Sequence, residues 1–235
     1  MNYIPCFEQP KNADLEHFET DEKREKLLAE IRRLRGNPEL YFPSVLPLWI
    51  AGQQRLRNDN ALGSCVVAHD NNRIMTRYAV VTTRDINDAI ESVLSARKTW
   101  AEIAWSDRLE IFNRAANLLD GKYFYQAMAV VMEDFSKTPW EAMIDIKELV
   151  DFWRANVYEA IKLYRNQPVS TDAERNYAVY RPLNGFVFAL PPNNFIAIGM
   201  NLPSAPLTMG NVVVCKPSKD TIASFHFMLN ILHEA

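Results

Sequence analysis

The spacing of apolar side chains predicts helices over most of the first two thirds of the chain. In residues 21–35 the apolar positions recur every three or four residues, acids lead and bases trail, which suits the helix dipole. Gly36 and Pro38 are expected to end this helix. The same spacing predicts further helices over 85–104, 106–120, 123–135 and 138–164.

Two polar residues are predicted to begin helices. Asp85 is the expected N-cap of the helix over 85–104. Thr138 is the expected N-cap of the longest helix, because Pro139 stands at the first helical position and Glu141 completes a capping box.

The pattern in the last third predicts strands that alternate with helices. Five runs of residues that are typical of β-strands occur along the chain: 45–54, 73–81, 176–182, 184–192 and 211–217. Pro47 favours an edge position for the first run, and 211–217 is apolar enough to predict a strongly buried strand. Residues 194–209 are apolar and interrupted by prolines, and 219–234 is a final amphipathic helix. This order predicts an α/β fold in which a parallel sheet opens near the end of the chain.

Composition and charge exclude several classes of function. The chain has 235 residues, 48% of them hydrophobic, which is enough for a sizeable core. Its net charge of −3 and the lack of a basic run argue against a nucleic-acid partner. No apolar stretch reaches the roughly 20 residues that span a bilayer. The acidic start resembles neither a signal peptide nor an intact transit peptide.

The cysteines predict neither disulfides nor a metal centre. Cys6, Cys65 and Cys215 are odd in number and widely spaced, with no His cluster beside them. A zinc site is therefore not expected, and a reducing compartment fits best.

Two stretches near the end of the chain resemble the aldehyde dehydrogenase superfamily. The first is YRPLNGFVFALPPNNF at 180–195, and the second is 201–218, which ends in MGNVVVCKPS. In that family a G-x-V-x-x-I-x-P-x-N-F turn precedes P-x-L-x-x-G-N-x-V-x-x-K-P-S. SKT at 136–138 and IDIKELVDFWRANV at 144–157 look similar to glutamate-semialdehyde (pyrroline-5-carboxylate) dehydrogenases in particular.

The resemblance implies the N-terminal part of the aldehyde dehydrogenase fold, with a helical segment followed by an incomplete parallel, Rossmann-like sheet. It divides the chain into an N-terminal helical extension (1–44), a helical and β region (45–167), a β-hairpin flap (168–183) and the truncated start of a dinucleotide-binding domain (184–235). In the family a flap near 168–182 takes part in dimerisation, so the resemblance implies a homo- or hetero-oligomer.

Asn194 matches the family asparagine whose side-chain amide stabilises the oxyanion during catalysis. From the local sequence alone, Asn193 and Asn194 are better explained as a turn after Pro191 and Pro192. The resemblance favours the oxyanion position, whether vestigial or active. The family usually has an aromatic at the position of Asn193, which leaves an altered loop as an alternative.

Three further residues are candidates through the same resemblance. Lys216, with Ser218 beside it, matches the family lysine that contacts the adenosine ribose of the nicotinamide cofactor; the alternative is a solvated lysine at a strand end. Glu148 matches a family glutamate near the amino-acid end of the substrate, and the alternative is one more charge on a long helix. Cys215 is expected to be a small buried hydrophobe and not a nucleophile.

The family's nucleophilic cysteine and general-base glutamate have no counterpart in this sequence. We therefore expect a truncated, non-catalytic relative that serves as a structural or accessory subunit, with a mitochondrial complex as one setting and with no cofactor. The alternative is the N-terminal half of an active dehydrogenase, split or incompletely represented, that uses NAD to oxidise glutamate γ-semialdehyde to glutamate in proline catabolism.

Both interpretations imply partners and a compartment. Other protein chains are expected to cover the surface of 184–235, which would otherwise leave sheet edges exposed. The mitochondrial matrix or the bacterial cytoplasm is the expected location.

Overall fold

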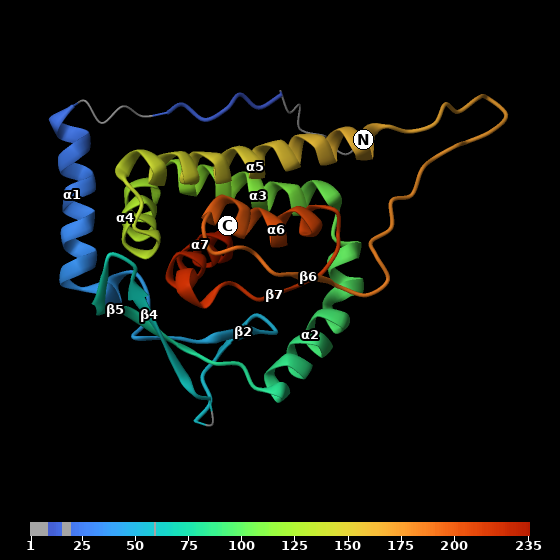
Figure 1. The fold of residues 1–235 in the computed structure, drawn as a ribbon. Coiled ribbons are helices and arrows are strands. Elements are labelled where there is room, and N and C mark those ends of the chain that lie inside the picture. The colour runs from blue at the N-terminus through green and yellow to red at the C-terminus, as the bar shows by residue number, and fades with distance from the viewer. Residues whose placement is uncertain (1–8, 16–19, 59) are drawn as a thin grey trace.

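The computed structural model describes residues 9–15, 20–58 and 60–235 (Figure 1). Its helices are α1 (Asp21–Gly36), α2 (Thr83–Glu102), α3 (Trp105–Asp120), α4 (Phe124–Phe135), α5 (Pro139–Arg165), α6 (Ile196–Thr208) and α7 (Ile222–Glu234), with 3-10 turns η1 (Pro38–Leu40) and η2 (Lys219–Thr221). Its strands are β1 (Val45–Leu46), β2 (Leu48–Ile50), β3 (Gln53–Arg55), β4 (Leu62–Val67), β5 (Asp70–Ala79), β6 (Val187–Ala189) and β7 (Val213–Cys215). The α/β class and the early helices are confirmed. Cys6 lies outside the described residues.

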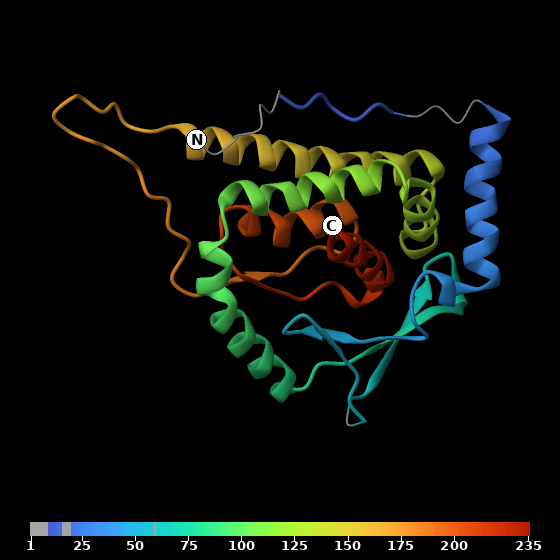
Figure 2. The ribbon, with the colours of Figure 1, turned by 180° about the vertical axis from the view of Figure 1, so that it is seen from behind.

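The core is centred on the long helix α5, which packs between its neighbours. It contacts α3 and α6, while α4 joins it to α7 and α1 (Figure 2). Trp153 of α5 is fully buried, and its Nε1 donates a hydrogen bond of 3.0 Å to Ser204 Oγ of α6. Because a buried indole N–H needs an acceptor, this bond sets how the two helices face each other.

The first strands form a small sheet with the order β1-β5-β4 and a separate β2–β3 hairpin. β1 lies at an edge, as predicted, but the run over 45–54 is three strands and not one. Pro47 separates β1 from β2, and the positive φ of Ala51 (57°) and Gly52 (70°) makes the turn between β2 and β3. Strand β4 was not predicted, because Gly63 interrupts its apolar pattern. The ring of Tyr78 covers Gly63 so closely that a Cβ there would lie 2.2 Å from it.

Strands β6 and β7 form the predicted parallel pair, with α6 as the crossover between them. The backbone N–H of Lys216 continues the ladder to the carbonyl of Ala189 at 3.0 Å. The prediction of a strongly buried strand at 211–217 is wrong, since the three residues of β7 are only partly buried. Among the described residues β6 is the one strand that pairs with β7, so the other edge of β7 has no strand partner.

Helix ends follow the capping chemistry with one correction. Thr138 and Glu141 form the predicted capping box of α5, with the Glu141 N–H donating to Thr138 Oγ1 at 3.3 Å. Asp85 is not the N-cap of α2. Thr82 takes that position, and Asp85 is the third helical residue, whose carboxylate accepts the Thr82 N–H at 3.0 Å. A threonine followed three residues later by an acid stands at the start of both helices, and only the pair at the start of α5 was predicted.

The apolar stretch over 194–209 is a helix despite its prolines. Pro203 and Pro206 both lie inside α6, which packs against α5 and the strand pair. Most of the face that α6 turns to α5 is fully buried, including Ala197 and Met200. Packing of this face outweighs the helix-breaking tendency of proline.

The predicted β-hairpin flap is an arm without strands. Residues 166–183 leave the end of α5, extend away from the body and return (Figure 1), and no strand is assigned to them. Side chains cross-link the two limbs instead: Asn176 N donates to Ser170 Oγ at 2.9 Å, and Ala178 N donates to Gln167 Oε1 at 2.8 Å. The predicted strand over 176–182 is absent because these bonds occupy the backbone groups that a ladder needs.

The N-terminal helix α1 packs on the core. Leu27, Ile31 and Leu34 of α1 are buried against α4. Glu133 of α4, only 3% exposed, accepts hydrogen bonds from Arg35 of α1 (2.7 Å) and from Arg73 of β5. Across the described ranges, no helix has the length and apolar content needed to cross a membrane.

A buried carboxylate holds the last helix, and no cation of the described residues pairs with it. Asp134 of α4 accepts the backbone N–H of Ser224, in the first turn of α7, at 2.7 Å and the thiol of Cys65 at 3.2 Å. Burial raises the pKa of Asp134 to about 6, although these hydrogen bonds oppose the shift.

This shift predicts a pH dependence of stability. Between pH about 4 and about 6 the native state holds a proton on Asp134 that the unfolded state has lost, so this residue lowers the free energy of unfolding as the pH rises. Urea unfolding is expected to show that Asp134→Asn gains stability relative to the wild type across that window.

Asp120→Asn is the matched control with the opposite sign. Burial works against ionisation of Asp120, but Lys147 and Arg154 outweigh it and lower the pKa of this carboxyl. The Asp120 variant should therefore lose stability relative to the wild type as the pH rises from acid. If the stability of both variants relative to the wild type changed with pH in the same direction, the opposite pKa shifts of Asp134 and Asp120 would be contradicted.

Candidate functional site

Two of the predicted site residues stand at one edge of the parallel strand pair. β6 and β7 run in the same direction, so their carboxyl ends meet at a common edge. Asn194 follows β6 and Lys216 follows β7. Ligands of parallel α/β sheets bind outside the carboxyl ends of the strands, so this edge is the candidate site.

Asn194 presents a free side-chain amide just before helix α6. It is exposed, and its side chain makes no hydrogen bond to the described part of the chain. Phe195, the next residue, is extended (φ −151°, ψ 114°) and forms the N-cap position of α6 without a side-chain cap of its own. The amide is therefore available to donate to an oxygen outside the chain.

The first turn of α6 is capped from another helix. The carboxylate of Asp145, in α5, accepts the N–H of Ile196 on Oδ2 (3.1 Å) and the N–H of Ala197 on Oδ1 (2.7 Å). Asp145 is fully buried, and Lys137 Nζ bonds its Oδ2 at 2.6 Å. A carboxylate at a helix N-terminus satisfies free N–H groups and suits the helix dipole.

Lys137 also touches the aromatic ring beside Asn194. Its Nζ lies 4.1 Å from the centroid of the Phe195 ring and 5.1 Å from that of Phe135. A cation within about 6 Å of a ring face is attracted to it. Lys137 therefore holds both the carboxylate that caps α6 and the ring that precedes α6.

Asp145 and Lys137 were not among the predicted site residues. The signal was present, since Asp145 stands on the apolar face of α5 beside Ala142, Ile146 and Leu149. A carboxylate at such a position requires hydrogen bonds and a cation. The partner N–H groups lie 51 and 52 residues further along the chain, so no local pattern identifies them.

Lys216 is exposed and free to reach a ligand at the same edge. Its Nζ makes a single bond within the described chain, of 3.3 Å, to the carbonyl of Pro217. The hydroxyl of Ser218 accepts the N–H of Asp220 at 3.2 Å and so caps η2. The lysine fits an anionic or hydroxyl-bearing ligand, while the hydroxyl of Ser218 is already used as an acceptor.

Glu148 lies one turn after Asp145 on α5, and the pKa of its carboxyl is raised. Burial, followed by the nearby carboxylates of Asp145 and Asp151, raises its pKa, and Lys137 opposes the shift. Its side chain has no hydrogen-bond partner within the described ranges. It remains an acceptor for a cation.

Cys215 is not the reactive group of this edge. It is partly buried at the end of β7, and burial raises the pKa of its thiol to about 12, against the effect of Lys216. A thiol with so high a pKa carries little of the nucleophilic thiolate form.

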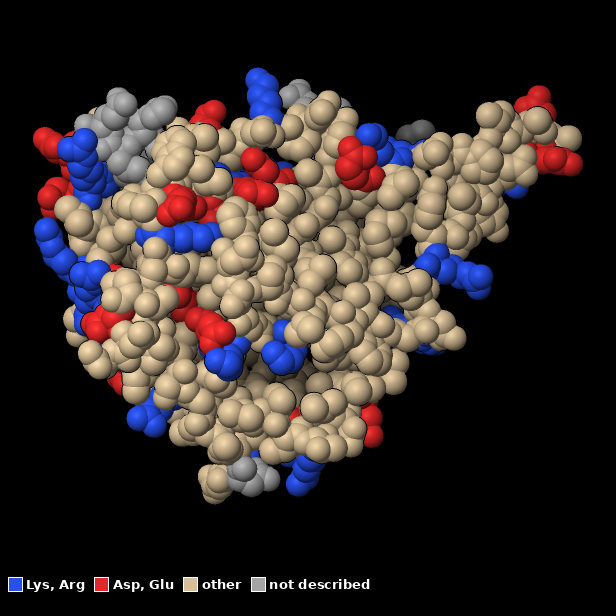
Figure 3. Space-filling view, in the orientation of Figure 1, with Lys and Arg blue, Asp and Glu red and all other residues tan. Residues whose placement is uncertain are grey.

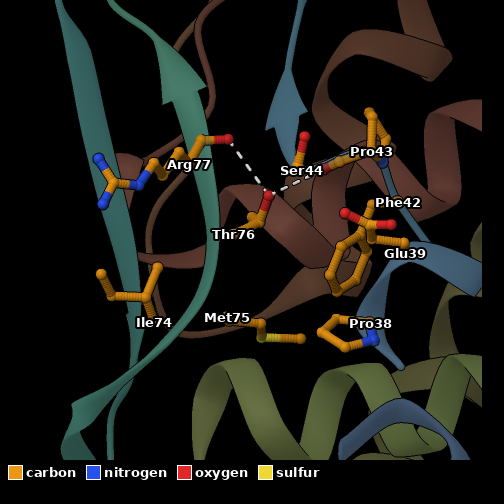
Figure 4. Close-up of a pocket in the computed structure, with 9 residues that line it drawn as sticks. All are labelled: Pro38, Glu39, Phe42, Pro43, Ser44, Ile74, Met75, Thr76 and Arg77. Carbon is orange, nitrogen blue, oxygen red and sulfur yellow. Dashed lines mark hydrogen bonds between the residues drawn. The ribbon is translucent and has the colours of Figure 1, made fainter. Parts of the chain in front are cut away.

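Two cavities in the described part of the chain are lined by other residues. One of about 270 Å³ is lined by Arg35, His69, Asp70 and Arg73. Another of about 200 Å³ lies between η1 and β5, where Thr76 Oγ1 bonds the carbonyls of Pro43 and Arg77 at 3.2 Å (Figure 4). No trio of His, Cys, Asp or Glu side chains in the described residues is grouped to hold a metal ion.

Charge is spread thinly over the face that carries the strand pair. Figure 3 shows separate acidic and basic residues around a broad area without charges. Apolar side chains on β6 and α6 and beside them are exposed: Phe188, Leu190, Ile198 and Leu202.

Known proteins resemble this chain along its whole length. The aldehyde dehydrogenase family model matches residues 59–235. The mitochondrial Δ1-pyrroline-5-carboxylate dehydrogenase of Emericella nidulans is 40% identical over 227 residues, which cover 95% of this chain and 38% of that protein. The probable Δ1-pyrroline-5-carboxylate dehydrogenase of Schizosaccharomyces pombe is 36% identical over 240 residues, which cover 100% of this chain and 43% of that protein.

Solved structures agree with this relationship. The crystal structure of the Δ-pyrroline-5-carboxylate dehydrogenase from Mycobacterium tuberculosis matches with a TM-score of 0.90 at 34% identity, covering 100% of this chain and 42% of that one. A structure of the same protein bound with NAD matches with a TM-score of 0.89 at 34% identity, covering 100% and 43%. The chain thus spans about two fifths of the length of these relatives.

The state of Cys215 predicts slow alkylation. In the native protein at pH 8, iodoacetamide is expected to modify Cys215 more slowly than in urea, on the order of 10²-fold, because burial suppresses the thiolate. Peptide mapping by mass spectrometry measures both rates, with the urea-unfolded protein as the internal control. Equal rates would show that the thiol is accessible and ionisable, and Cys215 would then be a candidate nucleophile.

Proposed function

The chain belongs to the aldehyde dehydrogenase family, and on that premise we propose that it contributes the oxyanion-stabilising asparagine and part of the cofactor edge to an NAD-dependent oxidation of glutamate γ-semialdehyde to glutamate. One observation carries the proposal. Asn194 and Lys216 each follow a strand of the same parallel pair, and each has an exposed side chain that can donate to a ligand at its carboxyl edge.

Asn194 has the chemistry of an oxyanion donor. When a nucleophile adds to an aldehyde, the carbonyl oxygen becomes negative, and a preorganised amide N–H stabilises that charge more than it stabilises the substrate. The exposed amide of Asn194 supports this role, because no group of the described chain competes for it.

Lys216 is the proposed contact to the ribose of NAD, and Ser218 shapes the turn beside it. Bound NAD supplies the acceptor for the hydride that leaves the aldehyde carbon. The single weak bond of the Lys216 ammonium supports a free cation at this edge. The hydroxyl of Ser218 accepts the N–H of Asp220, which supports a structural role for it in the turn.

Glu148 is the proposed partner for the ammonium group of the substrate. A carboxylate without a hydrogen-bond partner in the described chain, one helical turn from the Asp145 that caps α6, suits a cationic amino acid. Its raised pKa is expected to fall when an ammonium binds beside it.

The nucleophile and the general base must come from residues outside this sequence. We propose that the exposed apolar side chains of Phe188, Leu190, Ile198 and Leu202 are covered by the rest of the dinucleotide-binding sheet, on the same or another chain. We propose the mitochondrial matrix as the location, with the bacterial cytoplasm as the alternative. Relatives named as mitochondrial support the organelle.

A non-catalytic accessory subunit is the competing proposal. It is favoured by Asn193, which stands where the family resemblance predicts an aromatic. In that case the same face would meet chains of unrelated fold, and NAD would not bind.

Purification from the natural source, with an affinity tag at the gene, separates the two proposals. The dehydrogenase is expected to reduce NAD with glutamate γ-semialdehyde. Asn194→Ala should lower kcat on the order of 10²–10³-fold, as loss of an oxyanion donor does. Lys216→Ala should raise the Kd of NAD by about 10-fold, the value of one charge-assisted hydrogen bond.

Lys98→Ala is the control for loss of an exposed lysine. Lys98 lies on α2 and its side chain is 85% exposed, so its removal should change neither constant. No NADH formation by the wild type, together with co-purifying chains of unrelated fold, would sink the dehydrogenase and favour the accessory subunit.

A further inference from the structure

We infer that Asp145 and Lys137 are positioning residues that fix the loop carrying Asn194 in its donating geometry. The inference rests on the proposed function, because it concerns how the oxyanion donor is held. Neither residue contacts the reacting atoms; both act through the backbone and ring that follow Asn194.

We call Asp145 and Lys137 together the anchor of the loop. Its strength comes from the number of hydrogen-bond donors that one carboxylate accepts. Asp145 accepts from two consecutive N–H groups of α6 and from one ammonium, all at 3.1 Å or less. Hydrogen bonds to an ionised acceptor are about twice as strong as neutral ones. The fully buried position of Asp145 excludes water as a substitute acceptor.

Lys137 is itself fixed, so the anchor does not depend on a mobile side chain. It lies between Ser136, which adopts the left-handed conformation (φ 56°), and Thr138, the N-cap of α5. Its side chain is only 13% exposed. The turn from α4 to α5 thus delivers the cation to a defined place.

Asn194 is two residues away from the first anchored N–H. Ile196 is held by Asp145, and the ring of Phe195 is held by Lys137, so the chain is fixed up to the residue that follows Asn194. An oxyanion donor has to be held close to its productive position, because a displacement of about 1 Å can cost about 10²-fold in rate.

A second ion pair on α5 provides the matched control. Lys147 bonds Asp120 of α3 at 2.7 Å and is also largely buried, at 7% exposure. It joins α5 to α3, and within the described residues it bonds neither α6 nor the loop. Lys147→Met therefore removes a buried lysine from α5, the helix that carries Asp145, without changing Asp145 or Lys137.

Hydrogen exchange tests the anchor without any assay of activity. In the natively purified protein, Asp145→Asn is expected to speed exchange of the amides over 195–199 by about 10-fold or more, since an amide cannot accept all three bonds. Lys137→Met should act in the same direction, and Lys147→Met should leave these amides unchanged. If Asp145→Asn does not fold, Lys137→Met alone decides the test.

A double-mutant cycle with Asn194→Ala tests whether the anchor acts through the asparagine. Asp145→Asn is expected to lower kcat on the order of 10–10²-fold with KM for NAD unchanged. In the Asn194→Ala background the same substitution should cost less than about 3-fold, because its route to the oxyanion is already lost. Lys147→Met should give equal ratios in both backgrounds.

The outcomes separate the inference from the proposed function. Equal kcat ratios for Asp145→Asn in both backgrounds, or unchanged exchange over 195–199, would overturn the inference while the dehydrogenase stands. A wild type without NADH formation would overturn the proposed function, and the exchange rates would still decide whether Asp145 holds the loop.

Discussion

Carboxylates that extend from the helical part of the chain and cap later helices hold this fold together. Asp145 of α5 caps α6, and Asp134 of α4 accepts an N–H in the first turn of α7. Both acids are buried, and both partners lie at least 50 residues further along the chain. The strand–helix–strand–helix unit is therefore attached to the helices at both of its helix N-termini. Because an uncapped, buried helix end leaves N–H groups unsatisfied, these two contacts determine where the unit sits.

The two caps differ in their charged neighbours. Asp145 has Lys137 as its counter-ion. Within the described residues, the donors to Asp134 are a backbone N–H and a thiol, and burial raises the pKa of this carboxyl. The cap that has a counter-ion is the one that leads into the loop with Asn194.

Local rules predicted most of the helices and missed what depends on distant partners. The apolar spacing and the capping box of Thr138 and Glu141 gave α5 nearly to the residue. Strand β4 was missed because Gly63 serves the ring of Tyr78 on the neighbouring strand, and the arm over 166–183 lacks strands because Gln167 and Ser170 bond across it. The edge position of Asn194 and Lys216 follows from strand order, which the sequence predicted. Their anchor, Asp145, required the fold.

A crystal structure of the Asp145→Asn protein tests the central claim most directly. The account predicts that residues 193–197 move away from their wild-type course, while the β6–β7 register and the packing of α5 on α3 stay unchanged. A loop that superimposes on the wild type within coordinate error, with Asn194 in the same place, would contradict the claim that this buried carboxylate sets the site.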